Sequence, residues 1–298
     1  MGKQLVIPGA DYSANGIIPD YDFVFVLSPN SSATITVNGT TYSISNTTAK
    51  SREVGLNVAG TVTDINSLCK NQTSIESVII NKDLSSLSYC TEAFRGANKL
   101  KEVDLSATSI SSANSSFRIF QGCTILETVK LPSATLFNYP AYFFISAKNL
   151  AGVDFSKFIF KGDFSNAFQE TSAERFNGID TSQVSKMGYT FASSYAVNLD
   201  ISEFNTSSVS TMTHMFDGAK LMRTLILGAN FTMTSNTVKD EMFKGCTALE
   251  TINASQLLSS SETITALKSA VSGSTNVSGN ISLICSDVTL NWNGISWS

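Results

Sequence analysis

Histidine is nearly absent from this chain of 298 residues, which contains only His214. Ser-His-Asp and Cys-His catalytic systems need an imidazole base, and two-histidine metal sites need two imidazole ligands. Every familiar arrangement of this kind would have to depend on one residue. We therefore expect no catalytic site, no metal site and no cofactor.

Charge is also scarce, because only 15% of the residues are charged, against about 25% in an average soluble domain. The formal net charge is −4, and no run of lysine or arginine occurs. Nucleic-acid binding and attachment to anionic lipid both need a basic patch. We expect neither a nucleic-acid partner nor a membrane-surface role. Apolar residues make up 42% of the chain, enough to bury a core, so wholesale disorder is excluded.

The five cysteines are odd in number, widely spaced and without a Cys-x-x-Cys motif, so they indicate neither a zinc knuckle nor a disulfide framework. The first apolar run, Leu5 to Ile7, is far shorter than the core of a signal peptide, which needs about 7–15 residues. No run approaches the length of about 18 residues that spans a bilayer. We expect no membrane insertion, and export either by a route that the sequence does not show or after removal of a leader.

Serine, threonine and asparagine are abundant, at 45, 30 and 23 residues, and much of the chain is an internal repeat. The stretches beginning at Phe94, Phe120 and Phe243 share the frame Phe-x-Gly-(Ala/Cys)-x-x-Leu. A period between 23 and 27 residues connects eight anchor positions, which we expect to align as a core ladder. These anchors are Leu68, Phe94, Phe120, Phe144, Phe168, Phe191, Phe216 and Phe243.

Each unit predicts a helical turn around the anchor, followed by a short strand about nine residues later. The predicted strands include 78–80, 103–105, 129–131, 153–155, 199–201, 225–227 and 252–254. The unit that begins at Phe168 departs from the frame, because Phe176-Asn177-Gly178-Ile179 replaces the apolar-x-apolar strand. One unit cannot bury its apolar side alone, so the copies are expected to stack into a solenoid.

These units resemble the BspA-like leucine-rich repeats of bacterial surface proteins, and the resemblance covers roughly residues 61 to 258. It rests on the Phe-x-Gly-Cys-x-x-Leu-x-x-Val-x-Leu unit and on the stretch from Leu199 to Met212. The resemblance implies an α/β solenoid of the leucine-rich-repeat type, with a parallel sheet on one face and short helices on the other. It also implies a role in surface adhesion.

Three segments are predicted: a β-rich N-terminal segment or cap at 1–60, about eight solenoid units at 61–258, and a C-terminal cap at 259–298. Residues 23–27 predict a strand, and 33–44 predict a hairpin around Asn38-Gly39, a pair that suits a type I′ turn. Residues 261–271 carry a serine cap and helical apolar spacing, and 281–285 and 288–292 predict closing strands.

The outward positions of the repeated strands form the predicted binding face, because solenoids of this kind bind through the sheet. The face has polar, charged and apolar side chains, is mildly acidic and is poor in aromatic residues. The predicted binding residues are Glu102, Asp104, Thr128, Lys130, Asp154, Asn198, Asp200, Thr224, Ile226 and Asn253.

Three other candidate residues favour a structural role. Cys123 and Cys246 follow the anchor by three residues, where other units have alanine, so a small buried residue is all that the position requires. His214 stands where the neighbouring unit has Tyr189, which favours a partly exposed amphipathic position over a catalytic base.

Three functions compete. The first is a non-enzymatic binding or adhesion module, on the cell surface or secreted, that recognises an extracellular protein or glycan. The second is a polysaccharide-active enzyme on a parallel β-helix, which would draw a carboxylate pair from Glu102, Asp104, Asp154 and Asp200. The third is a structural or phage-like attachment protein. The sequence favours the first and leaves the oligomeric state open.

Overall fold

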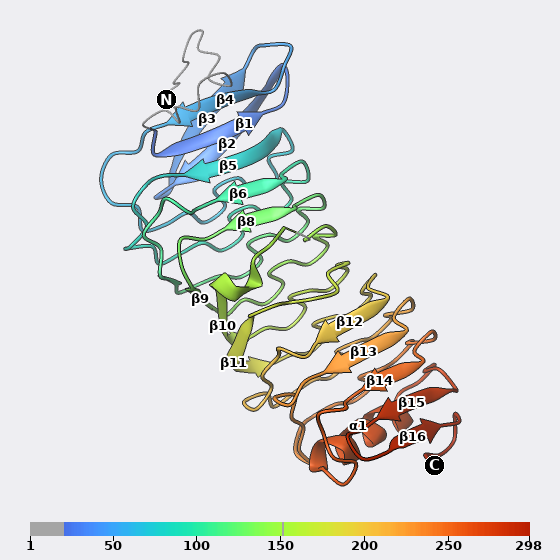
Figure 1. Cartoon of the computed structure of the whole chain (residues 1–298). Coiled ribbons are helices and arrows are strands. Elements are labelled where there is room, and N and C mark those ends of the chain that lie inside the picture. The colour runs from blue at the N-terminus through green and yellow to red at the C-terminus, as the bar shows by residue number, and fades with distance from the viewer. Residues whose placement is uncertain (1–20, 151) are drawn as a thin grey trace.

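The computed structural model describes residues 21–150 and 152–298 as a β-solenoid. Each coil contributes up to one strand to a first sheet, a strand or single bridge to a second sheet, and a tight turn that returns the chain to the first sheet (Figure 1). Part of the predicted N-terminal segment, residues 1–20, lies outside the described residues.

The first sheet consists of two separate pieces, in the orders β4-β1-β5-β6-β8 and β12-β13-β14-β15-β16. Strands of successive coils pair in parallel at both places, with Val78, Val103 and Val129 in register and turned into the core. The strands are β1 (Phe23–Leu27), β4 (Arg52–Leu56), β5 (Ile75–Ile80), β6 (Glu102–Asp104), β8 (Thr128–Lys130), β12 (Asn198–Ile201), β13 (Thr224–Leu227), β14 (Thr251–Asn253), β15 (Ile281–Ile284) and β16 (Thr289–Trp292).

The second sheet runs in the order β11-β10-β9-β7 and was not predicted from the sequence. Isolated bridges continue it in both directions, from Asp64 through Tyr89 to Ser115 and from Lys186 through Thr211 to Val238. Its strands are β7 (Ser112–Ala113), β9 (Thr135–Asn138), β10 (Phe158–Asp163) and β11 (Asp180–Lys186).

The short helices expected opposite the first sheet are not found, because α1 is the sole α-helix of the described residues. Glu92, two residues before the anchor Phe94, has a φ of 56°, and Gly96 has a φ of 71°. A right-handed helix cannot continue through left-handed residues. The turn satisfies its backbone by bonding to the next coil instead.

These turns form a third ladder of backbone hydrogen bonds along the solenoid. The N–H groups of Glu92, Phe94 and Gly96 donate to Phe117, Ile119 and Gln121 of the next coil at 2.8–3.0 Å. The same pattern of three bonds recurs from turn to turn up to Gly218, which donates to Lys244. In the first turn, the backbone N–H at the anchor position belongs to Cys69 and donates to the Ala93 carbonyl. The anchor of this turn is therefore Cys69, one residue after the predicted Leu68.

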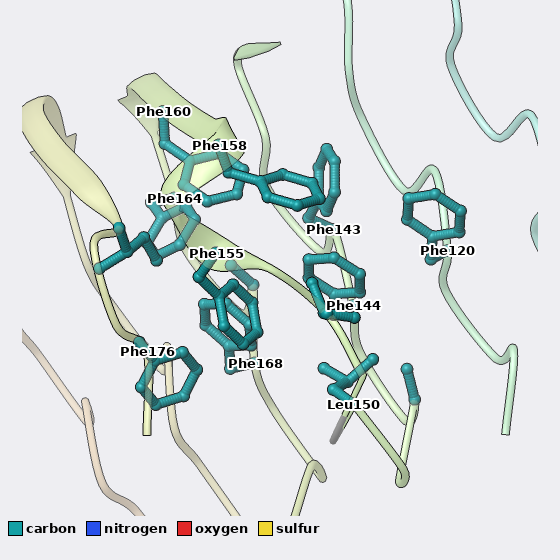
Figure 2. Packing of buried hydrophobic residues seen from close by; sticks show 14 of the residues in the cluster. Phe120, Phe143, Phe144, Leu150, Phe155, Phe158, Phe160, Phe164, Phe168 and Phe176 are labelled. Atoms are coloured by element: carbon teal, nitrogen blue, oxygen red, sulfur yellow. The ribbon is translucent and has the colours of Figure 1, made fainter. Parts of the chain in front are cut away.

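The anchor phenylalanines are buried and stack on one another in chain order. Phe94 and Phe120 have ring centroids 5.3 Å apart and an interplanar angle of 3°, and the next five steps span 5.2–5.9 Å. Around Phe144 and Phe168 the stack widens into a cluster that includes Phe155, Phe158 and Phe176 (Figure 2). The stack is Phe94, Phe120, Phe144, Phe168, Phe191, Phe216 and Phe243.

The local elements predicted near the ends are confirmed. The hairpin of β2 (Ser31–Val37) and β3 (Thr40–Asn46) turns at Asn38 and Gly39, whose φ values are 47° and 71°. Helix α1 (Glu262–Ser272) begins at the cap Ser261, whose side chain accepts a hydrogen bond from the Ile264 N–H. β15 and β16 are the predicted closing strands. No helix in the described ranges is long and apolar enough to span a membrane.

The outer edge of β16 is covered by the residues that follow it. Asn291 and Ser298 exchange two backbone hydrogen bonds of 2.8 and 2.9 Å, and the Trp292 and Trp297 rings lie 5.6 Å apart. The Trp297 Nε1–H donates to the Lys268 carbonyl of α1 at 3.3 Å. This end of the sheet therefore has a partner for its edge.

The strand predicted at 153–155 is wrong. A 3₁₀ helix at Phe155–Lys157 begins there, and the Asp154 carboxylate caps it by accepting the Ser156 N–H. The irregular unit at 176–179 lies in the next coil and forms no strand. The nearest pairing is a single bridge between Arg175, just before it, and Asp200. The first sheet is therefore interrupted between β8 and β12 (Figure 1).

Candidate binding face and cleft

Nine of the ten predicted binding residues lie on strands of the first sheet, Asp154 being the exception, and none of the ten is buried. The interruption divides them into two groups. One group has Glu102 beside Thr128 and Asp104 beside Lys130. The other has Asn198 beside Thr224, and Ile226 between Asp200 and Asn253. Asp154 belongs to neither group and lies at the interruption.

In the first group, Lys130 forms ion pairs with both neighbouring carboxylates. Its Nζ lies 2.5 Å from the Glu102 Oε1 and 3.2 Å from the Asp104 Oδ2. Hydrogen bonds to Glu102 and Asp104 raise the pKa of Lys130. Partial burial acts to raise the pKa of Asp104, but the hydrogen bonds from Ser106 and Lys130 outweigh it, and the pKa is lowered. A general acid needs a raised pKa, so this cluster is poorly suited to acid catalysis.

The aspartates of the face also hold the turn at the end of the strand. Asp104 Oδ1 accepts the Ser106 N–H at 2.9 Å and the Ser106 hydroxyl at 2.6 Å. Asp154 binds Ser156 in the same way, at 3.1 and 2.6 Å. This Asx-x-Ser motif recurs in the sequence and was not recognised there as a turn signal. Further examples are Asp83 with Ser85, Asp200 with Ser202 and Asn253 with Ser255.

A cleft of about 570 Å³ opens beside Asp154, where the first sheet is interrupted. This volume falls within the range of ligand pockets, about 300–1,000 Å³. Sequence reasoning missed its other polar residues, although the departure of the 176–179 unit from the frame was a signal. The cleft is lined by Asn149, Leu150, Val153, Asp154, Phe155, Ser172, Ala173, Glu174, Arg175 and Asn177.

The two carboxylates of the cleft already have hydrogen-bond partners, whereas its one cation does not. Glu174 Oε1 accepts the backbone N–H groups of Val197 and Asn198 at 3.2 and 3.4 Å. Asp154 holds Ser156 as described. Arg175 is exposed, and its guanidinium has no ion pair among the described residues. The described lining thus carries two carboxylates and one guanidinium.

The remaining candidates have structural partners. The thiols of Cys123 and Cys246 donate to the carbonyls of Phe94 and Phe216, the anchors of the preceding coils, at 3.0 and 3.1 Å. Burial raises the pKa of the Cys246 thiol to about 12 and raises that of Cys123 further. In the described part of the chain, no group of three His, Cys, Asp or Glu residues could hold a metal ion.

His214 lies on the turn face, away from the predicted binding face. Its Nδ1 lies 2.8 Å from the Asp217 Oδ2, and its ring stacks on Tyr189 with centroids 4.6 Å apart. Stacked rings of this kind continue the in-register contacts of the solenoid. The pairing with Tyr189 matches the position inferred from the repeat.

A family described as "Mycoplasma protein of unknown function, DUF285" matches residues 41–134 and 162–283 of the chain. The unmatched stretch between these ranges, 135–161, contains the 3₁₀ helix and one wall of the cleft. Neither the curated proteins nor the solved structures include a match to this sequence.

Proposed function

We propose that this chain, which belongs to the DUF285 family, is a non-enzymatic binding or adhesion module that recognises an extracellular protein or glycan through the outer side of its first sheet. The observation that carries the proposal is that the acidic residues of that face are bonded to neighbouring residues of this chain. Asp104, Asp154 and Asp200 each accept a hydrogen bond from the serine two residues later, and Glu102 pairs with Lys130.

Carboxylates held in this way support a structural role for these residues. A glycosidase would need one carboxyl with a raised pKa and a second carboxylate placed across the scissile bond. The long, solvent-accessible face of mixed polarity is instead suited to contact with a macromolecule.

The repeat pattern supports a location on the cell surface or in the secreted fraction. The units resemble BspA-like leucine-rich repeats, and adhesins of bacterial surfaces contain such units. We propose the same location for this chain. We also propose that it neither binds nucleic acid nor inserts into a membrane.

A binding screen tests the proposal directly. The full chain is immobilised and exposed to extracellular matrix proteins and to a glycan array, and saturable binding to at least one of them is expected. Ile226→Asp, on β13 of the face, should weaken that binding. Val238→Asp is the matched control, because Val238 is exposed on the second sheet. No saturable binding, or equal loss in both variants, would contradict the proposal, as would turnover of a polysaccharide by the purified chain.

A further inference from the structure

Three cations from successive turns converge on one carboxylate. Lys70, Arg95 and Arg118 lie about one repeat apart in the sequence, and the turn ladder brings their coils side by side. The Glu92 carboxylate lies 2.5 Å from the Lys70 Nζ, 2.6 Å from the Arg95 Nη1 and 3.8 Å from the Arg118 Nη1. Within the described ranges, no second carboxylate forms an ion pair with any of the three cations. The cluster therefore has three positive charges and one negative charge.

The carboxylate is the least exposed member of this cluster. The Glu92 side chain is 16% exposed, whereas each of the three cationic side chains is 31–35% exposed. A ligand that approaches from solvent therefore reaches the cations more readily than the carboxylate.

Arg118 is held in place without using its guanidinium as a hydrogen-bond donor to Glu92. Its guanidinium carbon lies 4.5 Å from the centroid of the Phe117 ring and 5.0 Å from that of Tyr142. The 3.8 Å to the Glu92 oxygen is too long for a hydrogen bond, and the Arg118 Nε has no partner in the described part of the chain. A guanidinium that is already ordered loses less side-chain entropy when it binds an anion.

A turn farther along the solenoid shows that this charge excess is not a general property of the repeat. Lys244 directly follows its anchor, as Lys70 and Arg95 follow theirs. Its Nζ, however, lies 3.9 Å from the Asp217 Oδ2, and Glu241 belongs to the same turn. Carboxylates therefore balance the charge of Lys244, which makes this residue a matched control.

We propose that the cluster of Lys70, Glu92, Arg95 and Arg118 binds a sulfated polysaccharide on the turn face of the solenoid. A local excess of positive charge attracts anions, and guanidinium groups form strong, charge-assisted hydrogen bonds with anionic oxygens. A sulfated polysaccharide carries sulfates close together on neighbouring sugars, which suits cations gathered around one point. This second surface goes beyond the proposed function, which places recognition on the first sheet.

Nucleic acid suits the cluster less well. Proteins that bind duplex DNA commonly contact about 6–10 phosphates spread along its backbone. Three cations around one carboxylate provide no such track, and the net charge of the whole chain is −4.

Calorimetric titration of the full chain with heparin is the first test. We expect saturable binding that weakens as salt is added, with a slope of log K against log salt no steeper than about −3, because three cations take part. Heparin from which the sulfates have been removed should bind at least about tenfold more weakly. Absence of heparin binding, equal binding of desulfated heparin, or equally tight binding of duplex DNA would overturn the inference.

Protein variants locate the site. Lys70→Gln and Arg118→Gln should each weaken heparin binding by about fivefold, and Lys244→Gln should leave it unchanged. Glu92→Gln should strengthen binding by about threefold, because it removes the one negative charge of the cluster. A general loss of folding cannot produce opposite effects at neighbouring residues.

Heparin binding that neither Lys70→Gln nor Arg118→Gln weakens, or that Glu92→Gln weakens, would contradict the assignment. The proposed function would survive this result, because it depends on the first sheet. Ile226→Asp, which tests that sheet, should leave heparin binding unchanged, and its loss in this variant would move the site away from the turn face.

Discussion

At the scale of single residues, the scarce reactive groups of this chain are occupied in holding the coils together. The buried thiols of Cys123 and Cys246 donate to carbonyls of the preceding coil, and aspartates such as Asp104 hold turns. Residues that look chemically active in the sequence therefore have structural partners.

The cysteines should be unreactive in the folded protein. All five are free and buried, and burial raises the pKa of the Cys90 and Cys246 thiols to about 12, so little thiolate exists near neutral pH. We expect Ellman's reagent to label none of them in native buffer and all of them in denaturant. Rapid labelling of the native chain would show that the thiols are accessible.

Glu92 should stabilise the fold in a pH-dependent way. Its carboxylate lies 2.5 Å from the Lys70 Nζ and 2.6 Å from the Arg95 Nη1. The Lys70 hydrogen bond, with the added effect of Arg95, lowers the pKa of Glu92 despite partial burial. The resulting stabilisation is present above the unfolded pKa of about 4.3 and is lost as pH falls through the lower folded value.

Glu92→Gln should therefore lower the free energy of unfolding at neutral pH by at most about 1 kcal/mol, and the difference should shrink on acidification. Denaturant unfolding at a series of pH values measures both effects. Glu203→Gln is the control, because Glu203 is exposed and has no ion pair in the described part of the chain. A difference that grows towards low pH would contradict the assignment.

At the scale of elements, close approach between coils sets strict limits on side-chain size. Gly228 follows β13, and a Cβ there would lie 1.9 Å from the Ser202 carbonyl oxygen of the preceding coil. A backbone atom cannot move aside as a flexible side chain could, so the two coils would have to separate.

We expect Gly228→Ala to destabilise the protein by about 1–3 kcal/mol, in the range of overpacked interiors. Thermal or denaturant unfolding provides the measurement. Gly279→Ala is the matched control, since an added Cβ there meets no atom within 4 Å, and its effect should stay within about 0.5 kcal/mol. Equal stability of the two variants would mean that the coils are free to move apart.

The first-sheet strands were predictable because their apolar residues recur in register, as Val78, Val103 and Val129 do. The turns were mistaken for helices because left-handed residues such as Glu92 and Arg118 carry no sequence signal of that conformation. The second sheet escaped prediction because its strands vary from two residues in β7 to seven in β11, and because single bridges replace them in the other coils. Nine of the ten predicted binding residues lie on first-sheet strands, all but Asp154, and their role in binding stays a prediction. The cleft could not be predicted because it depends on two neighbouring irregular coils and on contacts between them.

At the scale of the whole molecule, backbone hydrogen bonds run along the solenoid on three sides. The outer edges of the terminal strands would therefore be left unpaired unless other residues cover them. Asn291 and Ser298 cover the outer edge of β16 by two backbone hydrogen bonds. An uncovered strand edge pairs readily with another chain.

Removal of residues 294–298 should therefore promote self-association. We expect the shortened chain to elute from size-exclusion chromatography at a larger apparent mass than the full chain, increasingly so at higher protein concentration. A change of Ile295, which is exposed, to Ser is the control and should leave elution unchanged. A shortened chain that behaves like the full chain at every concentration would show that this edge needs no cover.

The interruption of the first sheet also has a mechanical consequence. At that level the turn ladder and the pairing of β10 with β11 still join the two coils, and only the first sheet lacks backbone bonds. The solenoid resembles a rod notched on one side, so a bending force that stretches the first sheet meets its least resistance there. Flexure should concentrate at the notch.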